Sequence, residues 1–367
     1  MQFSEIPGLD SLKTSLIKAV EKNHFAHAQL IHGHEGNGNL AVALALATYL
    51  NCQNRQATDS CGACSSCVKM SKVAHPDVKY IYPTAGGKKV LSANFIEQWR
   101  DFVQTKPFGN LSDWLEAIDV KQGNIPVEEA RLLIQDLSMK SYEGGYKIVL
   151  IWQAESLHTA TANALLKVLE EPPEQTIFLL VTNSTEQLLT TIISRTQRVW
   201  IPDFTDEDIE NYLVDKLTVT TERAKQATFL SQNNLRNALH ILESDTPENH
   251  QLFAEWMRKC YSAQLDELVL MSNEFDKKTK EQHKNFFEYG ITIFRELFLY
   301  AKGNEDLVRL VGDELIFVQR FSKALNFRNL EKITTLLGDA SYHIARNGRA
   351  KIIFLDLSLT LAGLLKK

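Results

Sequence analysis

Gly33-His34-Glu35-Gly36-Asn37-Gly38-Asn39-Leu40 is the stretch that decides the fold of this chain. It follows a short apolar run and precedes an alanine-rich helical pattern at residues 41–50. Strand, glycine loop and helix in that order are the setting of a P-loop, G-x-x-x-x-G-K-[S/T], whose backbone cradles phosphate. Gly33 and Gly38 stand at the two glycine positions of this motif, with Gly36 between them. A tight turn without a ligand is the alternative interpretation.

The two side chains that carry the chemistry of a P-loop are missing. Asn39 replaces the lysine that brings positive charge to the phosphates, and Leu40 replaces the hydroxyl that holds Mg²⁺. The sequence therefore predicts a degenerate P-loop at Gly33, Gly36 and Gly38 with no ATP in its own site. The remaining alternative is that backbone N–H groups at the start of the helix bind an anion, or a nucleotide that is not hydrolysed.

A second apolar run, residues 147–151, suits a buried parallel strand. In a P-loop ATPase such a strand ends in an Asp that holds Mg²⁺, followed by a catalytic Glu. Here Trp152 and Gln153 occupy those positions, and Glu155 lies two residues too far along the chain. We therefore expect no intrinsic ATPase activity.

Four of the five cysteines lie close together in the sequence, at Cys52, Cys61, Cys64 and Cys67. Two overlapping C-x-x-C steps place three thiolates in one compact turn, and the first cysteine supplies the fourth. Four thiolates suit a structural, tetrahedral Zn²⁺ and leave no open position for catalysis. The sequence predicts a zinc knuckle at residues 52–67, with a redox C-x-x-C as the weaker alternative. Cys260 is expected to be a small buried hydrophobe.

Length and composition indicate a globular protein with more than one domain. The 367 residues are 44% hydrophobic and 23% charged, and this length suits two or three domains. The net charge of -5 argues against a surface that binds nucleic acid throughout. Residues 1–5 lack the features of a signal peptide, and no apolar run reaches the ~20 residues of a membrane span. A cytoplasmic protein without a membrane partner is expected.

The strand and helix patterns divide the chain into three parts. Residues 1–202 alternate helical patterns with near-continuous Val/Ile/Leu strands, which predicts an α/β domain with a parallel sheet covered on both faces. Residues 203–245 predict a small helical domain, and residues 249–367 an all-helical C-terminal domain. The linker between them is expected at residues 244–248, where turn-forming residues gather. Residues 84–122 begin with a glycine-containing loop and hold two amphipathic segments whose role is not evident.

Several stretches together resemble the AAA+ clamp-loader proteins of bacterial replication. Besides the glycine loop and the knuckle, they are His75-Pro76-Asp77, Tyr142–Lys147, Ser194-Arg195-Thr196 and Asn163-Ala164-Leu165-Leu166-Lys167-Val168-Leu169-Glu170-Glu171-Pro172-Pro173. The family has Ser-Arg-Cys where this chain has Ser-Arg-Thr. The resemblance covers residues 3–243. It implies a P-loop NTPase-like AAA+ domain with an inserted zinc knuckle, a small helical lid and an all-helical collar.

The resemblance also implies a division of labour within a ring that loads the sliding clamp on primed DNA. Each ATP in such a ring lies between two subunits, and an arginine of one subunit reaches the γ-phosphate held by the other. Arg195 matches that arginine finger; a surface salt bridge is the alternative. We expect a non-catalytic subunit whose partners are the gamma/tau ATPase and delta subunits, with the clamp and primed DNA reached through the complex.

Three further residues match nucleotide-sensing positions of the family. Arg236 matches sensor 2 in the lid, and Thr182 and Asn183 match sensor 1. With no nucleotide site behind them, a structural role is expected. An active gamma/tau-like ATPase and a zinc-ribbon module that binds nucleic acid are the alternative functions. ATP binding would indicate the first, and salt-dependent DNA binding the second.

Overall fold

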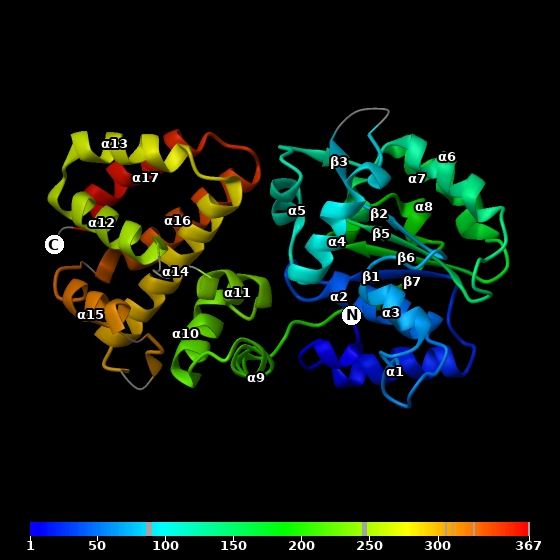
Figure 1. The fold of residues 1–367 in the computed structure, drawn as a ribbon. Coiled ribbons are helices and arrows are strands. Elements are labelled where there is room, and N and C mark those ends of the chain that lie inside the picture. Colours follow the sequence, from blue (N-terminus) through cyan, green and yellow to red (C-terminus); the bar gives the residue numbers. More distant parts are fainter. Residues whose placement is uncertain (86–89, 244–247, 305–306, 311, 326, 366–367) are drawn as a thin grey trace. The chain divides into compact units, whose positions relative to one another are not determined.

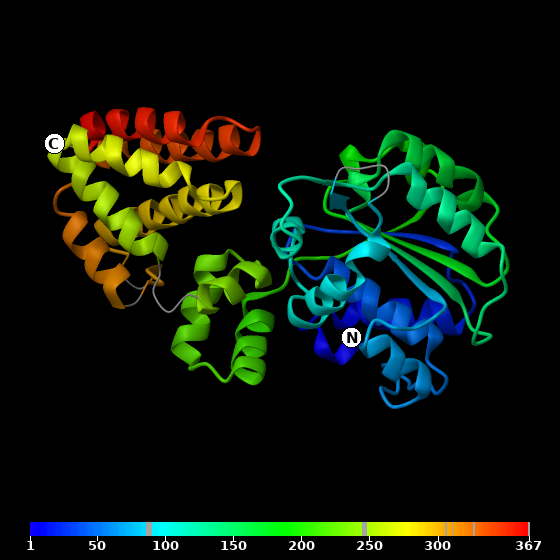
Figure 2. The same ribbon diagram turned by 45° about the horizontal axis from the view of Figure 1, so that its top comes forward.

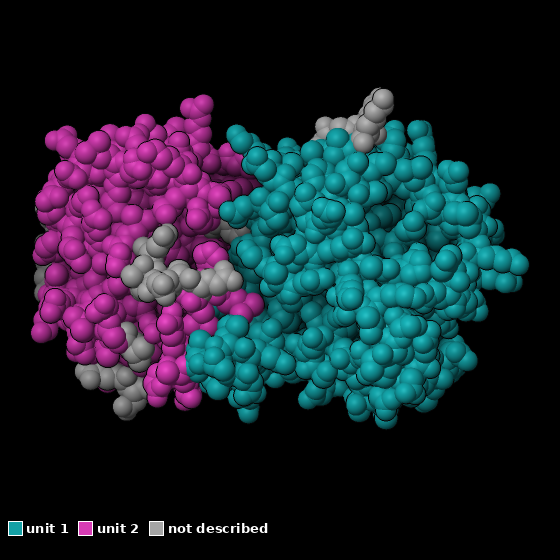
Figure 3. Space-filling view, viewed as in Figure 1, with its two compact units in different colours: residues 1–219, 233–238 teal, residues 220–232, 239–367 magenta. Residues whose placement is uncertain are grey.

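The computed structural model describes residues 1–85, 90–243, 248–304, 307–310, 312–325 and 327–365 (Figure 1). The chain divides into two compact units: residues 1–219 with 233–238, and residues 220–232 with 239–367 (Figure 3). The loop predicted at residues 86–89, and the linker predicted at 244–248 except its last residue, lie outside the described residues.

A five-stranded parallel sheet forms the centre of the first unit. Its strands, in spatial order, are β2 (Val78–Ile81), β5 (Lys147–Trp152), β6 (Thr176–Thr182), β1 (Ala28–His32) and β7 (Gln197–Trp200). Every pairing in this sheet is parallel, which confirms the predicted α/β class. All residues of β6 are buried, as expected for a strand covered on both faces.

Helices cover both faces of this sheet (Figures 1 and 2). One face packs against α6 (Val127–Leu137), α7 (Thr159–Glu170) and α8 (Thr190–Ile193) in a single apolar cluster. The other face packs against α2 (Asn39–Asn51), which is apolar on all sides and buried at every residue, as a helix enclosed by protein should be. Other α-helices of this unit outside the insert are α1 (Asp10–Glu21), α3 (Ser65–Ser71), α9 (Asp206–Leu217) and the start of α11 (Leu235–Glu243).

The segment between β2 and α6 forms a small substructure, which we call the insert (residues 84–124). A two-stranded antiparallel ribbon, β3 (Thr84–Ala85) and β4 (Gly123–Asn124), brackets it. Two helices, α4 (Ile96–Thr105) and α5 (Leu111–Ala117), lie between these strands and confirm the two amphipathic segments.

Aromatic side chains anchor the insert on the sheet. Trp99 of α4 stacks on Tyr82 with ring centroids 4.2 Å apart, and it lies 5.3 Å from Trp152 at the end of β5. Trp114 of α5 meets Tyr82 edge-on at 4.9 Å, and its indole N–H donates to the carbonyl of Pro83 at 2.7 Å. Because these rings are almost completely buried, they hold the insert firmly at the carboxyl ends of β2 and β5.

The second unit contains helices and no strand among its described residues. It contains α10 (Thr221–Ser231), the end of α11 (Leu235–Glu243), α12 (Glu248–Ser262), α13 (Leu265–Asp276), α14 (Lys280–Ala301), α15 (Gly312–Phe321), α16 (Leu330–Ala345) and α17 (Ala350–Leu364). Phe286, Phe287 and Phe294 of α14 lie in its core. The division into three domains at the predicted boundaries stays a prediction. None of the described helices is both long and apolar enough to span a bilayer.

Candidate functional site

The glycine loop lies between the carboxyl end of β1 and the start of α2, as the sequence predicted. Gly36 and Gly38 have φ values of +82° and +87°, in the region that favours glycine. A Cβ atom on Gly33 would lie 2.6 Å from the carbonyl oxygen of Ile201, and one on Gly36 would collide with the side chain of Asn234. The three glycines are therefore required by close packing around the loop, with or without a ligand.

Asn39, in the position of the P-loop lysine, binds the loop itself. Its side-chain NH₂ donates to the carbonyl oxygens of Gly33 and His34 at 3.0 and 3.3 Å. The same group donates to Oδ1 of Asn183, at the end of β6, at 2.9 Å. The residue is 5% exposed. Asn39 thus ties the loop to the predicted sensor-1 residue Asn183 and does not point to open space.

Little free volume remains beside the loop. A cavity of about 10 Å³ lies between the loop, Pro107–Gly109 of the insert, and Trp152 and Gln153 at the end of β5. One water molecule needs about 10–15 Å³, whereas ligand pockets measure roughly 300–1,000 Å³. This cavity is therefore too small to hold a nucleotide.

Side chains of the insert fill much of the space beside the glycine loop. Phe108, which is 3% exposed, lies with its ring 5.6 Å from that of Tyr212 and 6.2 Å from that of Phe204. A Cβ atom on Gly38 would meet both phenylalanine rings. The Asn110 side-chain NH₂ donates to Oε1 of Glu35 in the loop at 2.7 Å. No pattern in the sequence indicates this contact between the insert and the glycine loop.

Arg236, the predicted sensor-2 residue, forms a two-pronged salt bridge with Asp113 of the insert. Its Nε and Nη2 donate to Oδ2 and Oδ1 of Asp113 at 2.9 and 2.7 Å, and each side chain is 11% exposed. Burial by itself would raise the pKa of Asp113, but the hydrogen bonds and charge of Arg236 outweigh it and hold that pKa below its usual value. Arg236 thus has an anionic partner within its own unit, and its expected structural role stays a prediction.

The end of β5 carries no acidic pair at the predicted catalytic positions. Trp152 is 2% exposed and packs among the aromatic rings of the insert, and Gln153 is 4% exposed. Glu155 accepts a hydrogen bond from the backbone N–H of Asn183 at 3.1 Å. Burial raises the pKa of Glu155. Glu155 therefore links the ends of β5 and β6 by a hydrogen bond. Its position in the sequence is also two residues too far along the chain for either catalytic group.

Arg195 lies two residues after the end of α8. It contacts Glu170 of the segment Leu169-Glu170-Glu171-Pro172-Pro173. Its Nε donates to Oε1 of Glu170 at 2.7 Å, and Nη2 contacts the same oxygen. Its Nη1 donates to the carbonyl of Thr191 at 2.9 Å. The arginine side chain is 29% exposed and that of Glu170 is 48% exposed. Within the single chain, the predicted finger residue is thus held in a partly exposed salt bridge.

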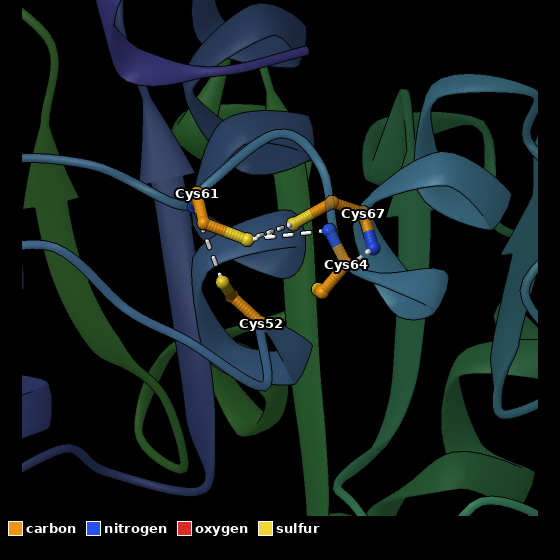
Figure 4. Close-up of side chains that lie close together, drawn as sticks. All are labelled: Cys52, Cys61, Cys64 and Cys67. Carbon is orange, nitrogen blue, oxygen red and sulfur yellow. Dashed lines mark hydrogen bonds between the residues drawn. The ribbon is translucent and has the colours of Figure 1, made fainter.

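The four clustered cysteines converge at the end of α2 and the start of α3 (Figure 4). Their sulfur atoms all lie within 4.8 Å of one another, and those of Cys61 and Cys67 are 3.9 Å apart. Tetrahedral Zn²⁺ with Zn–S bonds of ~2.3 Å places its sulfurs ~3.8 Å apart. None of the four forms a disulfide. The donor set and its spacing fit the predicted metal.

Backbone N–H groups of the knuckle point at its sulfur atoms. Those of Cys61, Cys64 and Cys67 donate to the sulfurs of Cys52, Cys61 and Cys64 at 3.2, 3.4 and 3.4 Å. Burial would raise the pKa of Cys64, but backbone N–H groups and the side chains of Cys67 and Cys61 lower that pKa to about 6, whereas burial raises the pKa of Cys52 and Cys67. Such hydrogen bonds favour the thiolate, the form that binds a metal.

The knuckle also holds the first residues of the chain. The carboxylate of Asp59 accepts hydrogen bonds from the backbone N–H groups of Phe3 and Ser4 at 3.0 and 2.9 Å. The side chain of Gln2 donates to the carbonyl of Ser60 at 2.7 Å. Asp59 was not singled out from the sequence; its position inside the knuckle, two residues before Cys61, is a weak signal for such a role.

The remaining family motifs are anchors between segments. Asp77 of His75-Pro76-Asp77 accepts hydrogen bonds from the backbone N–H groups of Tyr142 and Glu143 at 2.5 and 2.8 Å. Asn51, at the end of α2, exchanges two hydrogen bonds of 2.9 and 3.0 Å with the backbone of Tyr146. These motifs fix the approach to β5 and place no reactive group in the glycine-loop site.

Comparison with known proteins identifies relatives of this chain. A family model described as DNA polymerase III, delta subunit, matches residues 8–205. The DNA polymerase III subunit delta' of Yersinia pestis is 37% identical over 169 residues, which cover 46% of this chain and 39% of that protein. The delta' subunit of Escherichia coli K12 is 28% identical over 230 residues, covering 63% and 58%. The tau subunit of Bacillus subtilis is 26% identical over 377 residues, covering 96% and 60%.

This chain thus spans less than two thirds of the length of each of these relatives. Among solved structures, a gamma subunit-related protein of Thermotoga maritima matches with a TM-score of 0.41 and 16% identity, over 96% of this chain and 99% of that one. The family match covers more than half of the residues, and the delta' relatives agree with it. The chain therefore belongs to the DNA polymerase III delta-prime family of clamp-loader proteins.

Proposed function

We propose that this chain is a non-catalytic clamp-loader subunit of the DNA polymerase III holoenzyme. It would help to load the sliding clamp on primed DNA. Its Arg195 would act as the arginine finger for ATP bound to a neighbouring gamma/tau-type ATPase subunit. The observation that carries the non-catalytic part is the filled glycine-loop site, where about 10 Å³ remain open. Asn39 and Leu40 in the loop, and Trp152 and Gln153 on β5, support the same conclusion by their chemistry.

The surroundings of Arg195 suit a residue that changes partners. In the single chain it contacts one carboxylate oxygen of Glu170, and both side chains are partly exposed. A salt bridge of this kind contributes only ~0–1 kcal/mol. An arginine that stabilises the charge of a γ-phosphoryl transfer accelerates it by roughly 10³–10⁵. Release of Arg195 from Glu170 would therefore cost little compared with the transition-state stabilisation that the arginine could supply on a neighbouring subunit.

The proposal is tested with the reconstituted loader, its clamp and primed DNA. DNA-stimulated ATP hydrolysis is measured with the intact chain and with R195A, R195K and R198A. Arg198 is a matched control because it lies nearby on β7 and is exposed. We expect R195A to abolish turnover at the ATP site it faces and R198A to have no effect. R195K should fall between them, because lysine keeps the charge without the two-pronged geometry.

Two other outcomes would change the assignment. An unchanged rate with R195A would leave Arg195 as a salt bridge and the chain as a purely structural ring subunit. ATP hydrolysis by the isolated chain would make it an ATPase in spite of Asn39 and Trp152.

We further infer that the cysteine cluster holds a structural Zn²⁺. When bound, the metal would supply a tetrahedral cross-link between α2, the following loop and α3. A knuckle that binds nucleic acid would expose its flanking cations to the ligand. Two of these cations have partners within the chain. Arg55 donates to the carbonyls of Tyr49 and Leu50, and Lys69 pairs with Glu143. These contacts support a scaffold role over the alternative of a nucleic-acid-binding module.

A further inference from the structure

The insert contacts the glycine-loop corner in three chemically different ways. Phe108 covers Gly38 with an apolar ring, Asn110 donates to the side chain of Glu35, and Asp113 holds Arg236. Their combination mimics what a nucleotide presents to a binding site, namely a flat ring, polar groups and an anion.

We propose that the insert is a built-in ligand of the degenerate nucleotide site, in which the carboxylate of Asp113 takes the place of a phosphate opposite Arg236. The inference rests on contacts inside this chain. It goes beyond the proposed function and does not depend on Arg195.

The chemistry of the Asp113–Arg236 pair suits this substitution. A guanidinium group presents a planar fork that binds carboxylate and phosphate in the same two-pronged manner. Both oxygens of Asp113 are used, at 2.7 and 2.9 Å, and both side chains are 11% exposed. Arg236 at this depth requires an anionic partner, because a buried charge without one is costly. The insert supplies that anion permanently, whereas a nucleotide would supply it only while bound.

The same corner connects the start of α11 to the loop. The side-chain NH₂ of Asn234 donates to the carbonyl of Glu35 at 2.6 Å. Its Oδ1 accepts a hydrogen bond from the N–H of Asn237 at 3.0 Å, which caps the first turn of α11. Asp113 holds Arg236 one residue before that amide. Loop, insert and the first turn of α11 therefore form one connected network in which no atom of a nucleotide is needed.

This network predicts that residues 233–238 keep their protection when nucleotide is absent. The amides of Asn237 and Ala238 are suitable reporters, because they are bonded to Oδ1 and to the carbonyl of Asn234. Hydrogen exchange of the full-length chain is measured by mass spectrometry, with and without MgATP. The variants are D113N, R236Q, the double variant and D101N. Asp101 is a matched control, since it is an exposed carboxylate on α4 of the same insert.

We expect MgATP to leave exchange in the unmodified chain unchanged. D113N and R236Q should each accelerate exchange at residues 236–238 by at least about ten-fold, because each leaves a buried charge without its partner. The double variant should be no faster than the faster single variant, since both remove the same interaction. D101N should behave like the unmodified chain.

Three results would overturn the inference. They are exchange in D113N equal to that in D101N, additive effects in the double variant, and stronger protection of residues 233–238 in the unmodified chain on addition of MgATP. Circular dichroism checks that each variant is folded. If D113N does not fold, R236K decides: it keeps the charge and loses the fork, so it should accelerate exchange less than R236Q and more than D101N. These measurements use the isolated chain, so their failure is distinguishable from failure of the loader assay.

Discussion

Asp113 has a pKa below its ordinary value because Arg236 outweighs the effect of burial. A carboxylate with a lowered pKa stabilises the fold fully above its unfolded-state pKa of ~3.9, and this stabilisation disappears as the pH falls through the lower folded-state value. We expect D113N to lower the free energy of unfolding by about 3–5 kcal/mol at neutral pH. The difference should shrink below about pH 4. Urea titrations of both chains across this range measure it, and a difference independent of pH would contradict the pairing.

The residue scale also shows what the sequence could and could not predict. Gly33, Gly38 and Asn39 could be assigned because a P-loop has fixed spacing, so a missing lysine is visible at once. Asp113 could not be assigned. It is one acidic residue on the polar side of an amphipathic segment, and its partner lies 123 residues further along the chain. Local patterns carry no signal for such a pairing.

At the scale of elements, the insert depends on its buried aromatic side chains. Phe108 is 3% exposed and packs against the rings of Phe204 and Tyr212. We expect F108A to lower the free energy of unfolding by about 3–5 kcal/mol, the usual effect of truncating a buried phenylalanine. F298A is the matched control, because Phe298 is 42% exposed and should cost less than about 1 kcal/mol. Equal effects in urea unfolding would show that the insert does not pack as described.

The knuckle is the second element that permits a sharp test. We expect the purified chain to carry about one equivalent of zinc and C67S to carry almost none, because three thiolates leave the tetrahedron incomplete. C260A should retain the metal, since Cys260 lies in the helical core of the second unit. Elemental analysis of the three proteins decides, and zinc-free unmodified protein would reject the assignment.

Sequence periodicity predicted most helices and strands well, but it did not predict which elements pack against one another. The helices α4 and α5 follow from apolar spacing, and the buried strands from continuous Val/Ile/Leu runs. The position of the insert could not be predicted, because Trp99 and Trp114 contact Tyr82 and Trp152, and an amphipathic pattern does not say which surface it covers. In the same way, the cysteine spacing predicted a metal site but did not indicate that Asp59 would bind the backbone of Phe3 and Ser4.

At the scale of the whole molecule, the two units have separate cores. The apolar cluster between the sheet and α6–α8 belongs to the first unit, and the large aromatic cluster belongs to the second. Calorimetry should therefore resolve two unfolding transitions. Removal of zinc by a chelator should lower only one of them, since every proposed ligand lies in the first unit. A shift of ~2–4 °C corresponds to about 1 kcal/mol for a unit of this size. Equal shifts of both transitions would show that the units unfold together.

The order of the sheet has a consequence for synthesis on the ribosome. β1 lies between β6 and β7, and Ala28 pairs with Phe178, about 150 residues later. At roughly 5–20 residues per second, both neighbours of β1 emerge some 8–30 s after it does. During that interval an apolar strand with two open edges has no native partner, and such edges invite pairing with other chains. We therefore expect the nascent chain to need protection by a chaperone during this interval.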